Sequence, residues 1–205
     1  MNALKAEYDK LYNACNVHFS LGYALENVDG MVKRAFKYNL RGRVLDVGAG
    51  TGSESLYLAS RNIAVDAIDI SEVAIRKLQQ MARFHHLPLS VGVANAIETP
   101  IPGPYNGVIC NKVLQHFPQD AVEPFLAKIA AATAPGGLHL LRVHGECEYG
   151  RFRATEETWV TYREDELRSY YGDWQILDFQ EENCRVFRSG RRLELSSLVM
   201  IARKQ

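Results

Sequence analysis

Short runs of β-branched and other apolar residues alternate with segments of helical period along most of the chain. Seven runs have the length and composition of strands, namely residues 43–47, 63–70, 89–94, 105–111, 138–143, 174–187 and 193–204. After the second run, Ser71 can cap a segment in which Ile75, Leu78 and Ala82 recur every three to four positions. This alternation predicts an α/β protein with a parallel sheet covered by helices on both faces.

Two further helices are predicted in the second half of the chain. One face of the first is marked by the apolar residues Val122, Phe125, Leu126 and Ile129. The Pro-Gly-Gly segment at 135–137 is expected to end that helix. Three acidic residues at 164–166 place negative charge at the start of the second helix, which Gly172 can close. A turn around residues 189–190 joins the last two strands.

The N-terminal segment precedes the sheet and begins with a helical pattern. The residues on its apolar face are Leu4, Tyr8, Leu11 and Cys15. Two interpretations remain open, a helix that packs against the core or a lid over a binding site. A length of 205 residues predicts one domain, with residues 1–40 as the N-terminal helical segment and residues 41–205 as the core.

The composition is typical of a soluble globular protein, with 47% hydrophobic and 23% charged residues. The 24 basic and 24 acidic side chains cancel, so no overall positive field favours nucleic acid or a membrane surface. No stretch reaches the roughly 18 apolar residues that span a bilayer, and the acidic start is unlike a signal peptide. The four cysteines form no CxxC pair and the six histidines lack zinc-site spacing. We therefore expect reduced thiols, no metal and a cytoplasmic location.

The strongest chemical signal is a glycine-rich turn between the first strand and the next helix. Its candidate binding residues are Asp46, Gly48, Ala49, Gly50 and Gly52. Glycines let the backbone approach a ligand closely. A dinucleotide fingerprint would need glycine at Ser53, and the acid ahead of the glycines favours a ligand with a cationic amino-acid end over a diphosphate. A nucleotide site and a merely tight turn remain alternatives.

The second strand ends at Asp69, beside the glycine turn in a doubly wound sheet. A carboxylate there can accept hydrogen bonds from both hydroxyls of a ribose, and Ile70 can offer an apolar face to an adenine ring. The alternative is an acid that only caps the following helix, a task that Ser71 can already perform.

From Val44 to Lys204 the chain resembles the class I methyltransferases that use S-adenosylmethionine. The resemblance implies a Rossmann-like, doubly wound, mostly parallel sheet of seven strands with an antiparallel last strand. It implies that Asn95 and Ala96 meet the adenine, where most members have aspartate in place of Asn95. It also implies that the turn Asn111–Phe117 forms the floor of the donor site, where Asn111 contacts the cofactor. The product of the donor would be S-adenosylhomocysteine.

Within that superfamily, four segments are similar to the tellurite-resistance methyltransferases: residues 55–59, 65–67, 162–174 and 200–204. Members of that family transfer methyl groups to tellurium and selenium oxyanions. Their last hairpin bears a His-Arg pair and a further arginine in the substrate pocket. Arg188 and Arg192 match the two arginines, and Phe187 stands at the histidine position.

Other polar residues near the predicted site have two interpretations each. His116 is either a base near the transferred methyl group or a packed wall of the site. Arg142 and His144 either face the substrate or pair with neighbouring acids. Arg151 and Arg153 lie in a long connection, as part of a lid or as solvated surface.

These observations predict a methyltransferase that acts on a small molecule. A tellurium or selenium oxyanion and an organic hydroxyl, amine or thiol are both open as acceptors. The Lys-Asp-Glu set of RNA-methylating enzymes is missing, and Asn111–Leu114 replaces an Asn-Pro-Pro-Tyr segment, so nucleic acid is not expected as a substrate. A non-catalytic donor-binding module is the alternative function, and the sequence leaves monomer or homodimer undecided.

Overall fold

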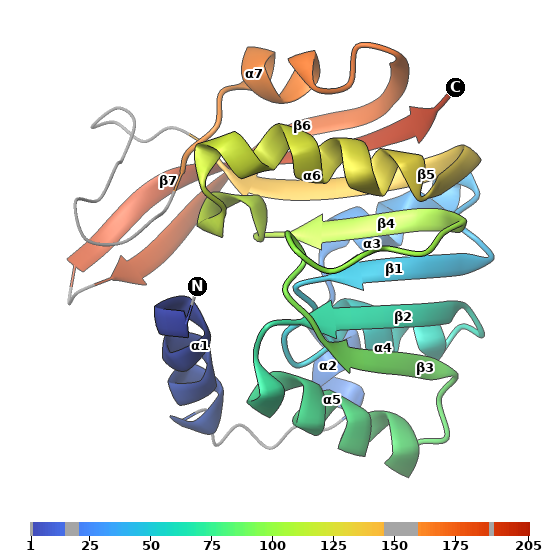
Figure 1. Cartoon of the computed structure of the whole chain (residues 1–205), viewed down its shortest axis with the longest axis vertical. Coiled ribbons are helices and arrows are strands. Elements are labelled where there is room, and N and C mark those ends of the chain that lie inside the picture. Colours follow the sequence, from blue (N-terminus) through green and yellow to red (C-terminus); the bar gives the residue numbers. More distant parts are fainter. Residues whose placement is uncertain (1, 15–20, 146–159, 189–190) are drawn as a thin grey trace.

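The computed structural model describes residues 2–14, 21–145, 160–188 and 191–205. Its centre is a seven-stranded sheet in the order β3-β2-β1-β4-β5-β7-β6 (Figure 1). The strands are β1 Arg43–Val47, β2 Ala64–Asp69, β3 Leu89–Val93, β4 Tyr105–Asn111, β5 Thr133–His144, β6 Trp174–Arg188 and β7 Arg191–Lys204. Strand β7 runs antiparallel to both of its neighbours, and the pairs among β1 to β5 are parallel. The predicted Rossmann-like sheet with an antiparallel last strand is confirmed.

Helices cover both faces of this sheet, as predicted. They are α1 Asn2–Ala14, α2 Leu21–Glu26, α3 Gly30–Ala35, α4 Ser53–Ala59, α5 Glu72–Phe84, α6 Gln119–Ala131 and α7 Glu164–Ser169, with short 3₁₀ turns η1 Phe36–Tyr38 and η2 Leu114–His116. Phe125 and Ile129 of α6 pack in one buried cluster with Leu141 of β5. Met31 of α3 and Leu58 of α4 pack in a second cluster, on the other side of the sheet (Figure 1).

The predicted start of the fifth strand is wrong by five residues. Helix α6 already ends at Ala131, and the segment 135–137 lies inside β5 instead of ending the helix. Pairing between the strands explains the difference. Tyr105 of β4 pairs with Thr133 of β5, and the register of the two strands then shifts between Tyr105 and Gly107. Gly136 has a φ of 74° within this irregular stretch. The turn-forming residues thus lie in an irregular stretch at the start of β5, inside the sheet. Helix α7 likewise ends at Ser169, ahead of Gly172.

The glycine-rich turn leaves β1 and opens α4. Gly48, Gly50 and Gly52 have φ values of 65°, 54° and 89°, a region that other residues adopt only with strain. Side chains also press against all three glycines, since a Cβ added to Gly50 would lie 2.7 Å from the Tyr12 hydroxyl. Strand β1 lies between β2 and β4, so the turn sits where the strand order reverses. Ligands of doubly wound sheets bind at this point.

Candidate active site

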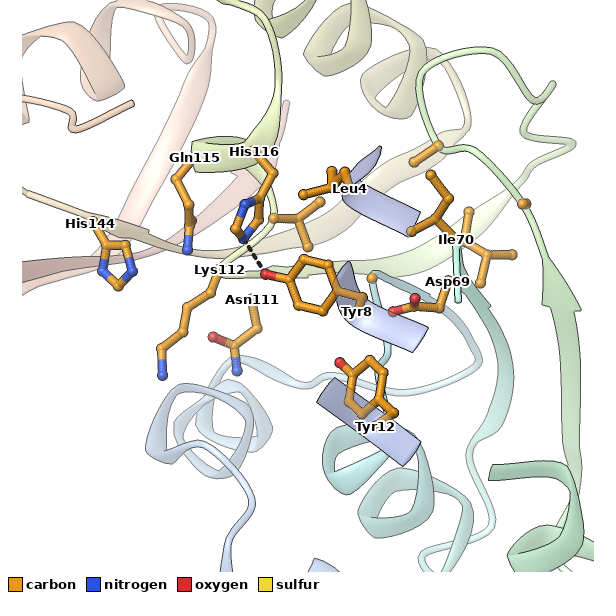
Figure 2. A pocket seen from close by; sticks show the side chains of 15 residues that line it. Leu4, Tyr8, Tyr12, Asp69, Ile70, Asn111, Lys112, Gln115, His116 and His144 are labelled. Atoms are coloured by element: carbon orange, nitrogen blue, oxygen red, sulfur yellow. Dashed lines mark hydrogen bonds between the residues drawn. The ribbon is translucent and has the colours of Figure 1, made fainter. Parts of the chain in front are cut away.

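A cavity of about 380 Å³ opens at the carboxyl ends of the central strands, beside α1 (Figure 2). This volume is at the lower end of the range for small-molecule sites, about 300–1,000 Å³. Its lining residues are Leu4, Tyr8, Tyr12, Gly48, Ile68, Asp69, Ile70, Ala94, Ala96, Asn111, Lys112, Val113, Gln115, His116 and His144. Six of the predicted site residues are therefore brought together: Gly48, Asp69, Ile70, Ala96, Asn111 and His116.

Asp69 supplies a carboxylate at one end of this cavity. Its side chain is 8% exposed and accepts hydrogen bonds from the backbone amides of Gly50 and Ser71, both at 2.8 Å. A carboxylate has about four acceptor positions, so two such bonds leave capacity for a ligand. Burial raises the pKa of Asp69 above its ordinary value. Ser71 caps α5 through Ala74, as predicted, and Asp69 itself contacts the same cap.

The remaining residues of the glycine turn lie behind the cavity wall. Asp46 is 2% exposed, does not line the cavity and accepts a hydrogen bond of 2.6 Å from the Ser55 hydroxyl. Burial and the neighbouring Glu54 raise the pKa of Asp46 well above its ordinary range. The Ala49 amide donates to the Ile68 carbonyl at 3.0 Å, which fixes the turn against β2. Asp46 and Ala49 thus shape the turn through these contacts, and their role as cofactor residues stays a prediction.

The loop after β3 forms another part of the wall. Ala94 and Ala96 line the cavity, whereas Asn95 does not, and its side-chain oxygen accepts from the Ile97 amide at 3.2 Å. Lys128 of α6 holds this loop from behind. Its ammonium donates to the carbonyls of Ala96, Ile97 and Thr99 at 2.6, 2.8 and 3.0 Å.

Helix α1 forms one wall of the cavity with Leu4, Tyr8 and Tyr12. This four-residue spacing differs from the predicted face, because Leu11 is 51% exposed and Cys15 lies outside the described residues. The helix therefore covers the site, as the lid interpretation of this segment expects, and its inner face carries two tyrosines.

Polar contacts hold α1 against α5. The Asp9 carboxylate accepts from the Ser71 hydroxyl and, at 3.4 Å, from the Val73 amide. Lys5 forms ion pairs with Asp9 at 2.9 Å and with Glu72 at 3.4 Å. Since Ser71 follows Asp69 by two residues, the same segment carries a cavity carboxylate and the anchor of α1.

The end of the cavity away from Asp69 is polar. Asn111, Lys112, Gln115, His116 and His144 line it. Tyr8 reaches across from α1, and its hydroxyl lies 2.8 Å from His116 Nε2 (Figure 2). The two rings meet edge to face, with centroids 5.4 Å apart. His116 thus lines the cavity wall in contact with α1, which both interpretations of this residue allow.

Arg142 and His144 have different surroundings. The Arg142 guanidinium pairs with Asp29 at 2.6 Å and with Glu182 at 2.9 Å, and it does not line the cavity. Arg142 therefore pairs with neighbouring acids, as one of its two interpretations expects, whereas His144 lines the cavity. Asn111 connects the cavity to this network by donating to Glu54 at 2.9 Å. Burial and the nearby Asp29 raise the pKa of Glu54.

The two predicted catalytic arginines belong to the β6–β7 hairpin. The backbone of Arg188 pairs with Arg191, and that of Arg192 pairs with Phe187. The side chains of Arg188 and Arg192 lie outside what the structure describes, and Arg151 and Arg153 fall in a segment that it does not describe. Their placement toward the cavity remains a prediction. Across the described residues, no helix has both the length and the apolar character needed to cross a membrane.

Sequence reasoning missed Tyr12 and Lys128, assigned Tyr8 no chemistry, and included Lys112 and Gln115 only as members of the turn Asn111–Phe117. The spacing of Leu4, Tyr8 and Tyr12 fits a helical face as well as the predicted one does, so the tyrosines themselves were the available signal. Lys128 stands beside the apolar positions of its helix, where a cation is unusual.

Comparison with known proteins gives consistent matches over most of the chain. The family described as "Tellurite resistance protein TehB" matches residues 11–201. The "Probable S-adenosyl-L-methionine-dependent methyltransferase TehB" of Haemophilus influenzae (strain 10810) is 25% identical over 197 residues, covering 92% of this chain and 66% of that protein. "Hemagglutinin 1" of Eikenella corrodens is 25% identical over 190 residues, covering 91% of this chain and 63% of that protein.

A solved structure shares the fold. The crystal structure of TehB from Haemophilus influenzae matches with a TM-score of 0.78 and 24% identity, covering 98% of this chain and 67% of that one. The chain spans just under two thirds of the length of the two curated relatives, at 66% and 63%.

Proposed function

The chain belongs to the family described as tellurite resistance protein TehB, and on this premise we propose that it is an S-adenosylmethionine-dependent methyltransferase that acts on a small molecule. The observation that carries the proposal is the position of Asp69. Its buried carboxylate lies at the carboxyl end of β2, bonded to the amide of Gly50 in the glycine turn, and lines a cavity of about 380 Å³.

The residues at this end of the cavity fit a nucleoside with an amino-acid tail. Asp69 can accept the ribose hydroxyls, and Ile70 and Ala96 offer apolar contacts for an adenine. The side-chain oxygen of Asn111 is buried and accepts no hydrogen bond from any residue that the structure describes. An ammonium group would supply the missing donor, as the amino-acid end of the methyl donor has.

Catalysis in such a site depends mainly on position. S-adenosylmethionine supplies a methyl group on a sulfonium, which is intrinsically reactive. The chain's own contribution is to hold an acceptor in line with that group under α1, and such positioning can lower a barrier by roughly 7–11 kcal/mol. The polar end formed by Tyr8, Lys112, Gln115, His116 and His144 is the place for the acceptor.

The family description favours a tellurium or selenium oxyanion as the first acceptor to test. Arg188 and Arg192 would bind such an anion if their side chains turn toward the cavity. A small organic hydroxyl, amine or thiol is the second possibility, and the size of the cavity suits it equally. A donor-binding protein without catalysis is the third.

Calorimetry and a labelled-donor assay test the proposal. The purified protein should bind S-adenosylmethionine and S-adenosylhomocysteine more tightly than NAD. It should also transfer label to one member of a panel of selenite, tellurite, phenols, thiols and amines. Tighter binding of NAD would refute the donor assignment, and donor binding without transfer to any acceptor would favour the non-catalytic alternative.

A further inference from the structure

We propose that Tyr8 and His116 together form the general base of this site, and that the acceptor is a small molecule with an acidic hydroxyl group, such as a phenol. The inference rests on the proposed function, because it names the acceptor class of the same cavity. Three independent observations at the polar end of the cavity support it.

The first observation is the contact between Tyr8 and His116. These residues come from α1 and from the turn after β4, 108 positions apart, and their polar atoms lie 2.8 Å from one another at the cavity wall (Figure 2). Imidazole is the side chain best suited to take up a proton near neutral pH. A tyrosine hydroxyl that donates to Nε2 still has two lone pairs, so it can accept a proton from a bound hydroxyl while passing on its own.

The second observation is an excess of hydrogen-bond acceptors. Gln115 is 1% exposed and lines the cavity, yet its side-chain oxygen accepts no hydrogen bond from the described part of the chain. The neighbouring oxygen of Asn111 is also unpaired among the described residues, but the ammonium group of the proposed methyl donor accounts for that atom. A buried acceptor left unpaired costs about 1–3 kcal/mol. A ligand that carries its own O–H can remove that cost.

The third observation is the charge at this end. Lys112 is the one lysine or arginine among the described residues that line the cavity, and Asp69, the one acid among them, lies at the opposite end. A lysine opposes binding of an alkylammonium acceptor and stabilises negative charge that develops on an oxygen. The acceptor class that fits all three observations is a neutral, acidic hydroxyl.

The chemical step balances without a further reactant. The acceptor oxygen forms a bond to the methyl carbon as the bond from that carbon to sulfur breaks, and the electron pair of the broken bond stays on sulfur. The hydroxyl proton of the acceptor passes to the Tyr8 oxygen while the Tyr8 proton passes to His116 Nε2. Solvent then takes the proton from His116 before the next turnover.

Tyr8→Phe and His116→Gln test the pair, because each removes one polar group and keeps the bulk of the side chain. Tyr38→Phe is the matched control, since the Tyr38 hydroxyl donates to the Leu177 carbonyl at 3.0 Å and does not line the cavity. All variants are first compared by urea unfolding and by S-adenosylhomocysteine binding. Both measurements should match those of the control.

A binding experiment needs no turnover. 4-Nitrophenol changes its absorption when it ionises, so its titration in the complex with S-adenosylhomocysteine reports proton loss to the site. The parent protein should move this ionisation to lower pH, and the Tyr8→Phe and His116→Gln variants should not. The other charged or titratable residues that line the cavity with His116 are Tyr8 and Tyr12 from α1, Lys112 from the turn after β4, His144 from β5 and Asp69 at the opposite end, so Lys112→Met is titrated as well. A shift that Lys112→Met abolishes and the Tyr8 and His116 variants retain would overturn the base assignment.

Methylation rates give the second readout. With phenol, which is not ionised at neutral pH, each of the two variants should be slowed at least about tenfold. With 4-nitrophenol, which is partly ionised already, the loss should be within about twofold. Equal rates for parent and variants on phenol would overturn the inference, as would methylation of selenite together with no methylation of any phenol. A parent protein that fails to bind S-adenosylhomocysteine would instead overturn the proposed function.

Discussion

The contribution of Asp69 to donor binding is the sharpest prediction from the geometry of the cavity. Replacing Asp69 by Asn keeps the shape of the side chain and removes its charge. The native carboxylate already accepts from the amides of Gly50 and Ser71, each at 2.8 Å. An amide has one acceptor oxygen, so Asp69→Asn must leave one of these amides facing an NH₂ group. The ribose hydroxyls would then compete for the oxygen that remains.

The size of the effect follows from the kind of bond that is lost. A hydrogen bond to a charged group contributes about 1.5–3 kcal/mol. We therefore expect S-adenosylhomocysteine to bind roughly 10- to 150-fold more weakly to Asp69→Asn than to the parent. Burial raises the pKa of Asp69, so this carboxylate takes up a proton at a higher pH than an exposed aspartate does. As the pH falls, donor binding to the parent should therefore weaken at a higher pH than it would with an exposed aspartate. The Asn variant should lack this dependence.

Isothermal titration calorimetry with S-adenosylhomocysteine at several pH values measures both expectations. Asp66→Asn is the matched control on the same strand, since Asp66 does not line the cavity and accepts instead from the Tyr105 hydroxyl at 2.9 Å. Urea unfolding of both variants separates a loss of stability from a loss of binding. If Asp69→Asn binds as tightly as Asp66→Asn, the carboxylate does not hold the ribose and the donor site has been misplaced.

Three further predictions concern the walls of the site. Lys128→Met should lower the free energy of unfolding by about 1–3 kcal/mol in urea denaturation, because three carbonyls lose a charged donor, and calorimetry should show weaker donor binding as the loop after β3 loosens. Asn95→Asp keeps the acceptor for the Ile97 amide, so it should leave donor affinity equal in the same calorimetric assay, or higher if the carboxylate reaches the adenine amino group; a clear loss would contradict the prediction that residue 95 meets the adenine. Arg188→Ala and Arg192→Ala should each slow an oxyanion acceptor at least about tenfold in the labelled-donor assay, and unchanged rates would identify both as surface residues.

The sheet and the donor end of the cavity were predictable because their signals are local. Alternating apolar runs and segments of helical period predict the strands and helices. The glycines themselves indicate a turn with positive φ values. Asp69 could be placed because the end of a parallel strand next to such a turn has a known position. Asp46 was recognised as part of the same motif, but its side chain is oriented by a hydrogen bond from Ser55 on the following helix.

Other parts of the site were less predictable because they are assembled from segments far apart in the chain. Tyr8 contacts His116 at the polar end, and Lys128 donates to carbonyls about 30 positions earlier in the loop after β3, so no sequence window contains either contact. The Pro-Gly-Gly segment shows the opposite failure. Its local preference for a turn was read correctly, but the pairing of Thr133 with Tyr105 extends the sheet beyond it.

Helix α1 lines the cavity and also packs against α5, and its side chains contact residues at both ends of the cavity. Tyr12 lies against Gly50, whose amide donates to the Asp69 carboxylate. Tyr8, one helical turn before Tyr12 on α1, contacts His116. The Asp9 carboxylate lies between these tyrosines in sequence and accepts from the Ser71 hydroxyl, which also caps α5. The carboxylate proposed to hold the donor and the anchor of α1 thus lie in one segment, from Asp69 to Ser71. Displacement of α1 would remove the contacts of Gly50 and His116 together.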